Sequence, residues 1–187
     1  NKTKFTYKTK ITEHYPQQYN MKQINCFIPF ENATQAAKTI DNLCQSALLN
    51  KIYLLSTNAE SSFEGCETIV IDNLQSSATM QKIAAKSDTE YSLIYTKHTT
   101  LETGQFALER FSRIAGDTNA GLVYADYYEV KEGNRSTHPV IDYQEGSLRD
   151  DFNFGSVLFY NAAMLRKAVE ANRTDYQFAG LYDLRLR

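Results

Sequence analysis

The sequence predicts an α/β domain with a mainly parallel central sheet flanked by helices. Short apolar runs of strand length alternate with stretches in which apolar residues recur every three or four positions. This alternation is typical of strand–helix–strand crossovers. With 42% hydrophobic and 22% charged residues among 187, the chain also has the composition of one globular domain. We therefore expect one buried sheet covered by helices.

The first half of the chain contains the clearest elements. Four apolar runs predict buried strands, at residues 24–30, 52–55, 68–71 and 91–95. We expect a helix with Thr34 as its N-cap, a short helix capped by Ser76 or Ser77, and a third helix over 103–115 that ends at Gly116.

The second half predicts an antiparallel addition to this sheet. A long strand is expected over 122–130, and Glu132, Gly133 and Asn134 predict a turn back to a partner strand near 136–141. Residues 142–153 are polar and predict a surface loop. An apolar strand over 154–159 and a helix capped by Asn161 follow.

The two ends of the chain differ from its centre. Residues 1–20 are expected to form an arm or an edge strand outside the main domain, because lysines alternate there with apolar and threonine side chains. We place the domain at 21–187. Residues 182–187 are expected to begin a helix, so we expect the domain to be truncated at its C-terminus.

Charge and cysteine content exclude several classes of protein. Twenty Lys and Arg against 22 Asp and Glu leave a net charge of −2, which argues against a nucleic-acid binder driven by counterion release. Cys26, Cys44 and Cys66 match neither a redox pair nor a zinc site, and we expect them to be small apolar fillers. No apolar run approaches the ~20 residues of a membrane span, so we expect a cytoplasmic protein. The oligomeric state stays open.

The candidate chemistry lies where the predicted strands end. In an open parallel sheet, ligands bind beyond the carboxyl ends of the strands. The eight glycines are dispersed and form no phosphate-binding loop of the Walker or dinucleotide kind. The candidate positions are the segments that follow the strands, namely 29–32, 56–58, 72–73, 96–99 and the loop 142–153.

Three stretches carry a resemblance to a known family. Residues 24–32 form an apolar strand that ends in Pro-x-x-Asn, residues 90–95 form a second strand, and residues 154–159 precede a helix and the final segment 182–187. In this order they resemble the nucleotide-diphospho-sugar transferase (GT-A) fold of the family 2 glycosyltransferases. The resemblance spans about 24–187 and implies transfer of a sugar from a nucleotide-sugar donor to a hydroxyl acceptor such as a glycan.

The resemblance also implies nucleotide-binding residues. It places the nucleotide against the end of the first strand and the end of the second. Asp72 would stand in for an acidic residue that the family carries near the second strand. The candidate nucleotide-binding residues are Pro29, Phe30, Asn32, Ser56, Asp72, Lys97 and His98.

The sequence departs from the family where a metal ion would bind. Thr96, Lys97 and His98 occupy the position of the family's Asp-x-Asp, and they are poor ligands for Mg²⁺ or Mn²⁺. We therefore expect no metal site. In one interpretation Lys97 or His98 supplies the positive charge toward the diphosphate instead. In the other, these residues belong to a solvated loop.

A second departure concerns the catalytic base. Gly180 and Leu181 occupy the position of the family's Glu-Asp pair, and leucine cannot accept a proton. The candidate catalytic carboxylates are then Asp183, whose counterpart is mainly structural, and Asp150 or Asp151. Alternatively, Arg149 pairs with one of those two and only fixes the loop.

Two functions follow from these departures. The first is an active family 2-like glycosyltransferase. The second is a degenerate relative that binds a glycan, a nucleotide or a protein partner without chemistry. A sugar nucleotidylyltransferase comes third, because Glu31, Asn32 and Ala33 follow the first strand instead of a glycine-rich basic loop. The abundant tyrosines, such as Tyr127 and Tyr128, either stack on sugar rings or belong mostly to the core.

Overall fold

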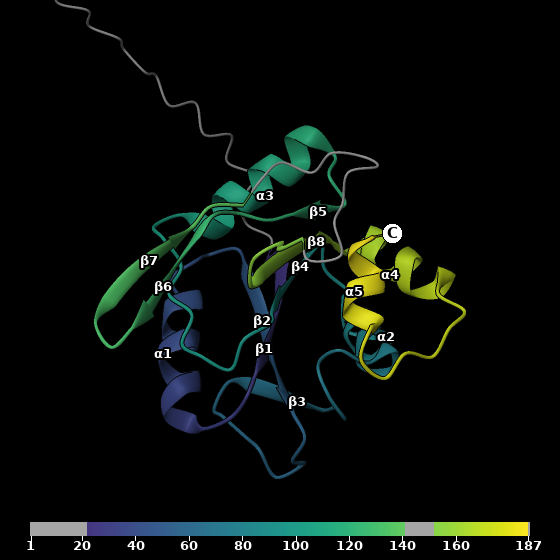
Figure 1. Cartoon of the computed structure of the whole chain (residues 1–187), viewed down its shortest axis with the longest axis horizontal. Helices are drawn as coiled ribbons and strands as arrows, with labels where there is room; N and C mark the ends of the chain where they lie inside the picture. Colours follow the sequence, from purple (N-terminus) through teal and green to yellow (C-terminus); the bar gives the residue numbers. More distant parts are fainter. Residues whose placement is uncertain (1–21, 141–151, 187) are drawn as a thin grey trace, which may run out of the picture.

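The fold is a mixed six-stranded sheet between two layers of helices (Figure 1). The computed structural model describes residues 22–140 and 152–186. The predicted arm at 1–20 and the candidate carboxylates Asp150 and Asp151 lie outside the described residues. Six of the described strands form the main sheet, in the order β3-β2-β1-β4-β8-β5. Their bounds are β1 (Ile24–Pro29), β2 (Leu49–Ser56), β3 (Cys66–Val70), β4 (Tyr91–Tyr95), β5 (Leu122–Val123) and β8 (Val157–Asn161).

Strands β1 to β4 are parallel, and β8 runs antiparallel to both β4 and β5. Every residue of β1 and β4 is buried, because helices cover both faces of the sheet. A strand buried on both faces reads as a continuous apolar run, which is why these two were visible in the sequence. The α/β class and the mostly parallel sheet are therefore confirmed.

Five helices within residues 22–140 and 152–186 cover the sheet. Helices α1 (Ala33–Leu43) and α3 (Ala107–Thr118) pack on one face. Helices α2 (Ser77–Ala85), α4 (Ala162–Ala171) and α5 (Gly180–Arg185) pack on the other. Figure 1 shows α1 on one side of the strands and α2, α4 and α5 on the opposite side. Each face of the sheet thus has its own hydrophobic core.

The start of α1 differs from the prediction. The N-cap is Asn32, not Thr34: its backbone is extended and its side-chain oxygen accepts a hydrogen bond from Gln35 N at 3.0 Å. Thr34 lies inside the first turn, where it is exposed. Asparagine is a preferred N-cap residue, so the helix begins as soon as the chain leaves β1.

Helix α3 is displaced along the chain from its predicted span. It covers Ala107–Thr118 rather than 103–115, and Gly116 lies inside it. The helix ends at Asn119, whose φ of 53° is left-handed, a conformation that asparagine tolerates better than most residues. Before the helix, Thr103 donates from its backbone N–H and its hydroxyl to Asn42 Oδ1, which holds the chain out of the helix.

The predicted long strand over 122–130 is wrong. Its first part is β5 in the main sheet, and its second part is β6 (Tyr127–Lys131), which pairs only with β7 (Asn134–His138). Glu132 and Gly133 both have positive φ, as the two central residues of a tight type I′ turn require. The turn is confirmed, and the hairpin forms a separate ribbon beside the main sheet (Figure 1).

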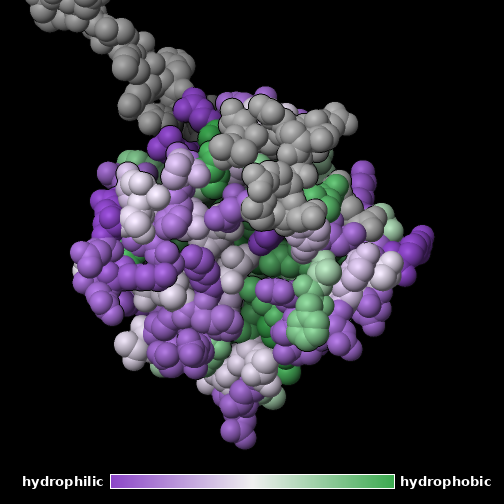
Figure 2. Space-filling model, in the orientation of Figure 1, coloured by the Kyte–Doolittle hydropathy of each residue, from purple (hydrophilic) through white to green (hydrophobic). Residues whose placement is uncertain are grey.

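Several smaller predictions can be compared with the structure. Ser76 and Asn161 cap α2 and α4. Cys26 is buried, but Cys44 is exposed at the end of α1, so it is not the core filler that the pattern indicated. Among the described residues, no helix is long and apolar enough to cross a membrane. The surface visible in Figure 2 is mainly hydrophilic, with apolar side chains visible in a hollow near its centre.

We expect Gly180→Ala to destabilise the protein. A Cβ at Gly180 would lie 2.5 Å from Ser77 N, a backbone atom that cannot move aside without disturbing α2. Overpacking of this kind costs about 1–3 kcal/mol of unfolding free energy. Denaturant titration of the variant measures the loss. Gly104→Ala is the matched control, because its Cβ would meet nothing within 4 Å. Equal stability of the two variants would contradict the close contact between α5 and α2.

Candidate functional site

The carboxyl ends of the four parallel strands lie along one edge of the sheet, which we call the carboxyl edge. In the register of the sheet, Pro29 lies beside Leu55, Ser56 beside Val70, and Phe27 beside Ile94. The segments that follow β1, β2, β3 and β4 therefore begin side by side. The candidate segments 29–32, 56–58, 72–73 and 96–99 thus share one edge of the sheet.

The strand order reverses between β1 and β4. From β1 the sheet grows through β2 to β3, and the chain then returns through α2 to β4 on the other side of β1. The first crossover helix, α1, and the second, α2, therefore lie on opposite faces. At such a reversal the loops diverge and leave a crevice, which is where open α/β sheets bind their ligands. The candidate site is the carboxyl edge between β1 and β4.

The end of β1 provides the first wall of this site. Pro29 is buried, and Phe30 is partly exposed after its backbone N–H has donated to Leu55 O at 2.9 Å. Asn32 uses its side-chain oxygen to cap α1, and its amide nitrogen carries two donors. The exposed part of Phe30 and this amide are the groups that a bound base could contact.

Ser56 and Asp72 have structural roles in the described chain. The Ser56 hydroxyl lies 2.8 Å from Ser61 Oγ and accepts from Asn58 N, so it organises the loop after β2. Asp72 accepts hydrogen bonds from the Ser76 hydroxyl at 2.7 Å and from the Thr79 hydroxyl at 3.1 Å. The hydrogen bond from Ser76 is the main cause that lowers the pKa of Asp72 to about 2. Contacts of these two residues with a nucleotide stay predictions.

The loop after β4 is fixed to α1. The Gln35 side-chain amide donates to Thr99 O at 3.1 Å, and Leu101 N donates to the Thr39 hydroxyl at 3.0 Å. The Tyr95 hydroxyl lies 2.7 Å from Thr99 Oγ1. Lys97 and His98 therefore belong to an anchored loop. His98 is exposed and makes no hydrogen bond or ion pair with the residues that the structure describes.

Lys97 is held by the β6–β7 hairpin. Its Nζ atom lies 3.2 Å from Glu129 Oε1 and 5.3 Å from the centre of the Tyr127 ring. Glu129 also contacts Lys131 and His138, each at 3.5 Å from its Oε2 atom. We call Lys97, Glu129, Lys131 and His138 the Glu129 cluster. The hydrogen bond from Lys97 is the main cause that lowers the pKa of Glu129.

Aromatic contacts fix the hairpin against the end of the sheet. Tyr127 stacks on His138 with 4.8 Å between ring centres, and its hydroxyl accepts from the Asn153 amide at 3.2 Å. A Cβ at Gly155 would lie 3.5 Å from the Tyr127 ring, so the chain before β8 passes close to it. Thr96 N donates to Ser156 O at 2.9 Å and joins the end of β4 to the same segment.

Sequence reasoning missed Gln35, Thr39, Glu129, Lys131 and His138. In the sequence, the two α1 residues have no feature that distinguishes them from other helix residues. The three hairpin residues belong to a polar strand pattern that is typical of an exposed hairpin. Their proximity to Lys97 depends on where the hairpin packs. Tyr127 was the one residue of the hairpin's inner face that the sequence analysis had singled out.

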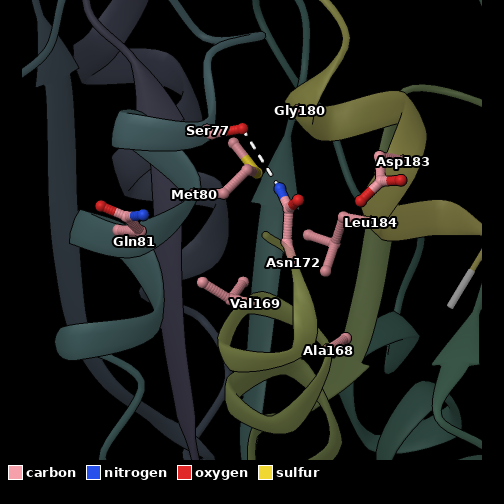
Figure 3. A pocket seen from close by; sticks show the side chains of 9 residues that line it. All are labelled: Ser77, Met80, Gln81, Ala168, Val169, Asn172, Gly180, Asp183 and Leu184. Atoms are coloured by element: carbon pink, nitrogen blue, oxygen red, sulfur yellow. Dashed lines mark hydrogen bonds between the residues drawn. The ribbon is translucent and has the colours of Figure 1, made fainter. Parts of the chain in front are cut away.

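The candidate base positions Gly180, Leu181 and Asp183 lie in the helical layer of α2, α4 and α5, on the other face of the sheet from α1. Gly180 and Leu181 are buried between α5 and α2, and Leu181 packs in the core. Asp183 lines a small hollow between α2, α4 and α5, together with Met80, Asn172 and other residues (Figure 3). The cavity volume of this hollow is about 10 Å³, which has room for roughly one water molecule. No sugar fits there, so this hollow does not support a catalytic role for Asp183.

No three His, Cys, Asp or Glu side chains come together in a metal-binding arrangement within residues 22–140 and 152–186. The nearest group to such a site at the carboxyl edge, the Glu129 cluster, contains one carboxylate and two lysines. Ammonium groups cannot coordinate a metal ion.

Comparisons with known proteins leave the family open. No protein-family model matches the chain, and no curated protein matches it significantly. The relation to family 2 glycosyltransferases therefore stands as a resemblance of sequence stretches.

We expect Asp72→Asn to lower stability near neutral pH. The depressed pKa of Asp72 means that its ionised form is bound more favourably in the folded state, so its contribution is present above the unfolded pKa of about 3.9. This contribution is lost as the pH falls toward about 2. The gap in denaturation midpoint between wild type and variant should therefore shrink from pH 5 toward pH 2, as checked by urea titrations at each pH. Glu64→Gln, at an exposed carboxylate before the other end of β3, is the control, and a gap independent of pH would contradict the assignment.

We expect Thr39→Val to loosen the loop after β4. The substitution preserves the shape of a fully buried side chain but leaves Leu101 N–H without its acceptor. Such a loss costs about 1–3 kcal/mol. Amide hydrogen exchange should become faster at Leu101 and its neighbours. Thr34→Val, at an exposed position of the same helix, should leave that exchange unchanged. Unaltered protection at Leu101 in Thr39→Val would show that α1 does not hold the loop.

Proposed function

We propose that the protein binds a nucleotide-sugar at the carboxyl edge between β1 and β4 and transfers the sugar to a hydroxyl acceptor such as a glycan. The observation that carries this proposal is the reversal of strand order between these two strands. It brings the Pro-x-x-Asn end of β1 next to the loop that contains Lys97 and His98. The four parallel strands and the antiparallel β8 also agree with the GT-A type of sheet that the sequence stretches resemble.

The residues at the ends of β1 and β4 suit the two ends of a nucleoside diphosphate. Phe30 offers a partly exposed ring and Asn32 offers amide donors, which suits a base. On the β4 side, Lys97 offers a positive charge in an anchored loop, which suits a diphosphate. The Ser56 and Asp72 segments lie further along the same edge and would contact the donor only through their loops.

Besides binding the donor, sugar transfer needs a positive charge near the diphosphate and a base for the acceptor proton. The bond between the sugar and the diphosphate breaks, the acceptor oxygen forms a bond to the same carbon, and the acceptor proton passes to a base. A positive charge near the leaving diphosphate stabilises the charge that develops there, and Lys97 takes this role in our proposal. Asp150 and Asp151 are the candidate bases. In the sequence they precede Asn153, which donates a hydrogen bond to Tyr127. Tyr127 belongs to the hairpin that also contacts Lys97.

A second candidate function is a binding module that recognises a nucleotide or glycan without chemistry. Two observations favour it. Leu181, at the position where the family has its base, is part of the core. The segment after β4 carries Thr96, Lys97 and His98 in place of carboxylates.

Nucleotide binding tests the proposal. We expect uridine or guanosine diphosphate to bind in calorimetry, with an affinity that Mn²⁺ does not raise, because Thr96, Lys97 and His98 stand in place of the family's Asp-x-Asp. Lys97→Ala should weaken binding about tenfold through loss of a charged hydrogen bond, whereas Lys38→Ala, exposed on α1, should not. An increase with Mn²⁺ would contradict the metal-free site.

Absence of any nucleotide effect would refute the proposed function. Where a nucleotide binds, release of the nucleoside diphosphate from a nucleotide-sugar in the presence of acceptor glycans separates the two candidates. Turnover supports the transferase, and binding without turnover supports the module.

A further inference from the structure

We propose that Glu129 occupies the place of the donor's diphosphate in the ligand-free protein, and that Lys97, Lys131 and His138 bind the diphosphate once it displaces this carboxylate. The inference rests on the proposed function and extends it, because it adds three residues of the β6–β7 hairpin to the site. It also assigns the hairpin a purpose: the ligand would join it to the loop after β4.

The geometry of the Glu129 cluster is that of an anion site already holding an anion. Three nitrogen atoms surround one carboxylate: Lys97 Nζ lies 3.2 Å from Oε1, while Lys131 Nζ and His138 Nε2 lie 3.5 Å from Oε2. The last two nitrogens share one oxygen, so they lie no further apart than twice that distance. A phosphate group presents the same paired anionic oxygens with more charge, so it fits the same three nitrogens.

The alternation of the hairpin explains why these groups converge. Tyr127, Glu129 and Lys131 point to the same side of β6, because successive side chains of a strand alternate. His138 lies opposite Tyr127 in the register, and Ser136 lies opposite Glu129. Ser136 Oγ is 3.4 Å from His138 Nε2 and adds a hydroxyl to the same face. This face turns toward Lys97, while Tyr128 and Val130 are exposed on the other face.

Displacement of Glu129 is energetically easy. Its side chain is 28% exposed and that of Lys131 is 79% exposed, and ion pairs so close to solvent contribute little to stability. Aromatic contacts hold Lys97 and His138 in place when the carboxylate leaves. The Tyr127 ring stacks on His138, Lys97 Nζ lies over this ring, and the Tyr127 hydroxyl accepts a hydrogen bond from Asn153. Two of the three nitrogen-bearing side chains therefore keep their places, and the exposed Lys131 is free to follow the incoming anion.

The protein contains a matched arrangement away from the carboxyl edge. Glu67 in β3 contacts Lys51 Nζ at 2.8 Å and Lys86 Nζ at 2.5 Å, and both lysines lie near the Tyr53 ring. Glu67 is the second residue of β3, so it lies toward the opposite end of the strands. Removal of the Glu67 carboxylate changes the net charge and frees two lysines, as removal of the Glu129 carboxylate does. These two lysines lie away from the carboxyl edge, where the donor is proposed to bind.

Binding of inorganic pyrophosphate, measured by calorimetry at low salt with a metal chelator present, tests the inference. We expect Glu129→Gln to raise the affinity about fivefold, the equivalent of one exposed ion pair that no longer competes. Lys97→Ala should lower the affinity about tenfold. Lys131→Ala should lower it as well, and Glu67→Gln should leave it unchanged.

Any one of three results would overturn the inference. Pyrophosphate binds to no variant, Glu129→Gln does not raise the affinity for pyrophosphate, or Glu67→Gln raises that affinity by the same factor. Uridine diphosphate separates this inference from the proposed function. If it binds no better than pyrophosphate while Glu129→Gln still gains affinity, the nucleotide function fails and the diphosphate site stands. If it binds well and Glu129→Gln changes nothing, the function stands and the inference fails.

Discussion

The pairing of β1 with β4 at the centre of the sheet is the contact on which the rest of the structure depends. Both strands are buried on both faces, and each lies between two hydrogen-bonded neighbours. Backbone groups in such a position have no access to water and must be paired within the sheet. This pairing fixes the reversal of strand order, and the reversal places the ends of β1 and β4 side by side with α1 and α2 on opposite faces.

Around this centre, two kinds of contact shape the carboxyl edge. Buried or half-buried hydrogen bonds from α1 hold the loop after β4, and these are costly to break. Ion pairs near solvent join that loop to the hairpin, and these are inexpensive to exchange. The loop is therefore held firmly by α1, whereas its ion pairs with the hairpin exchange more easily. In our proposal, a charged ligand at this edge would exchange with these ion pairs and leave the hydrogen bonds from α1 in place.

The helical layer formed by α2, α4 and α5 has a different role. Gly180 lies against the start of α2, and backbone hydrogen bonds join Ser77 to Tyr176 and Gly180 to Gln75. The region that resembles the catalytic segment of the family is therefore used here to complete the core. Leu181 in this region is buried at an apolar position that is closed to water. Chemistry at the carboxyl edge would require a base from elsewhere in the chain.

Much of this protein was determined by the sequence alone. The four parallel strands, the existence of the helices, the tight turn at Glu132 and Gly133 and the caps at Ser76 and Asn161 follow from local patterns, because each depends on residues close together in the chain. Only the tertiary structure decided the break between β5 and β6, the late start of α3 and the meeting of Lys97 with Glu129, which are 32 residues apart. These features depend on which faces are buried against each other and which side-chain partners become available there. That information is absent from local periodicity and appears only when the strands have found their order.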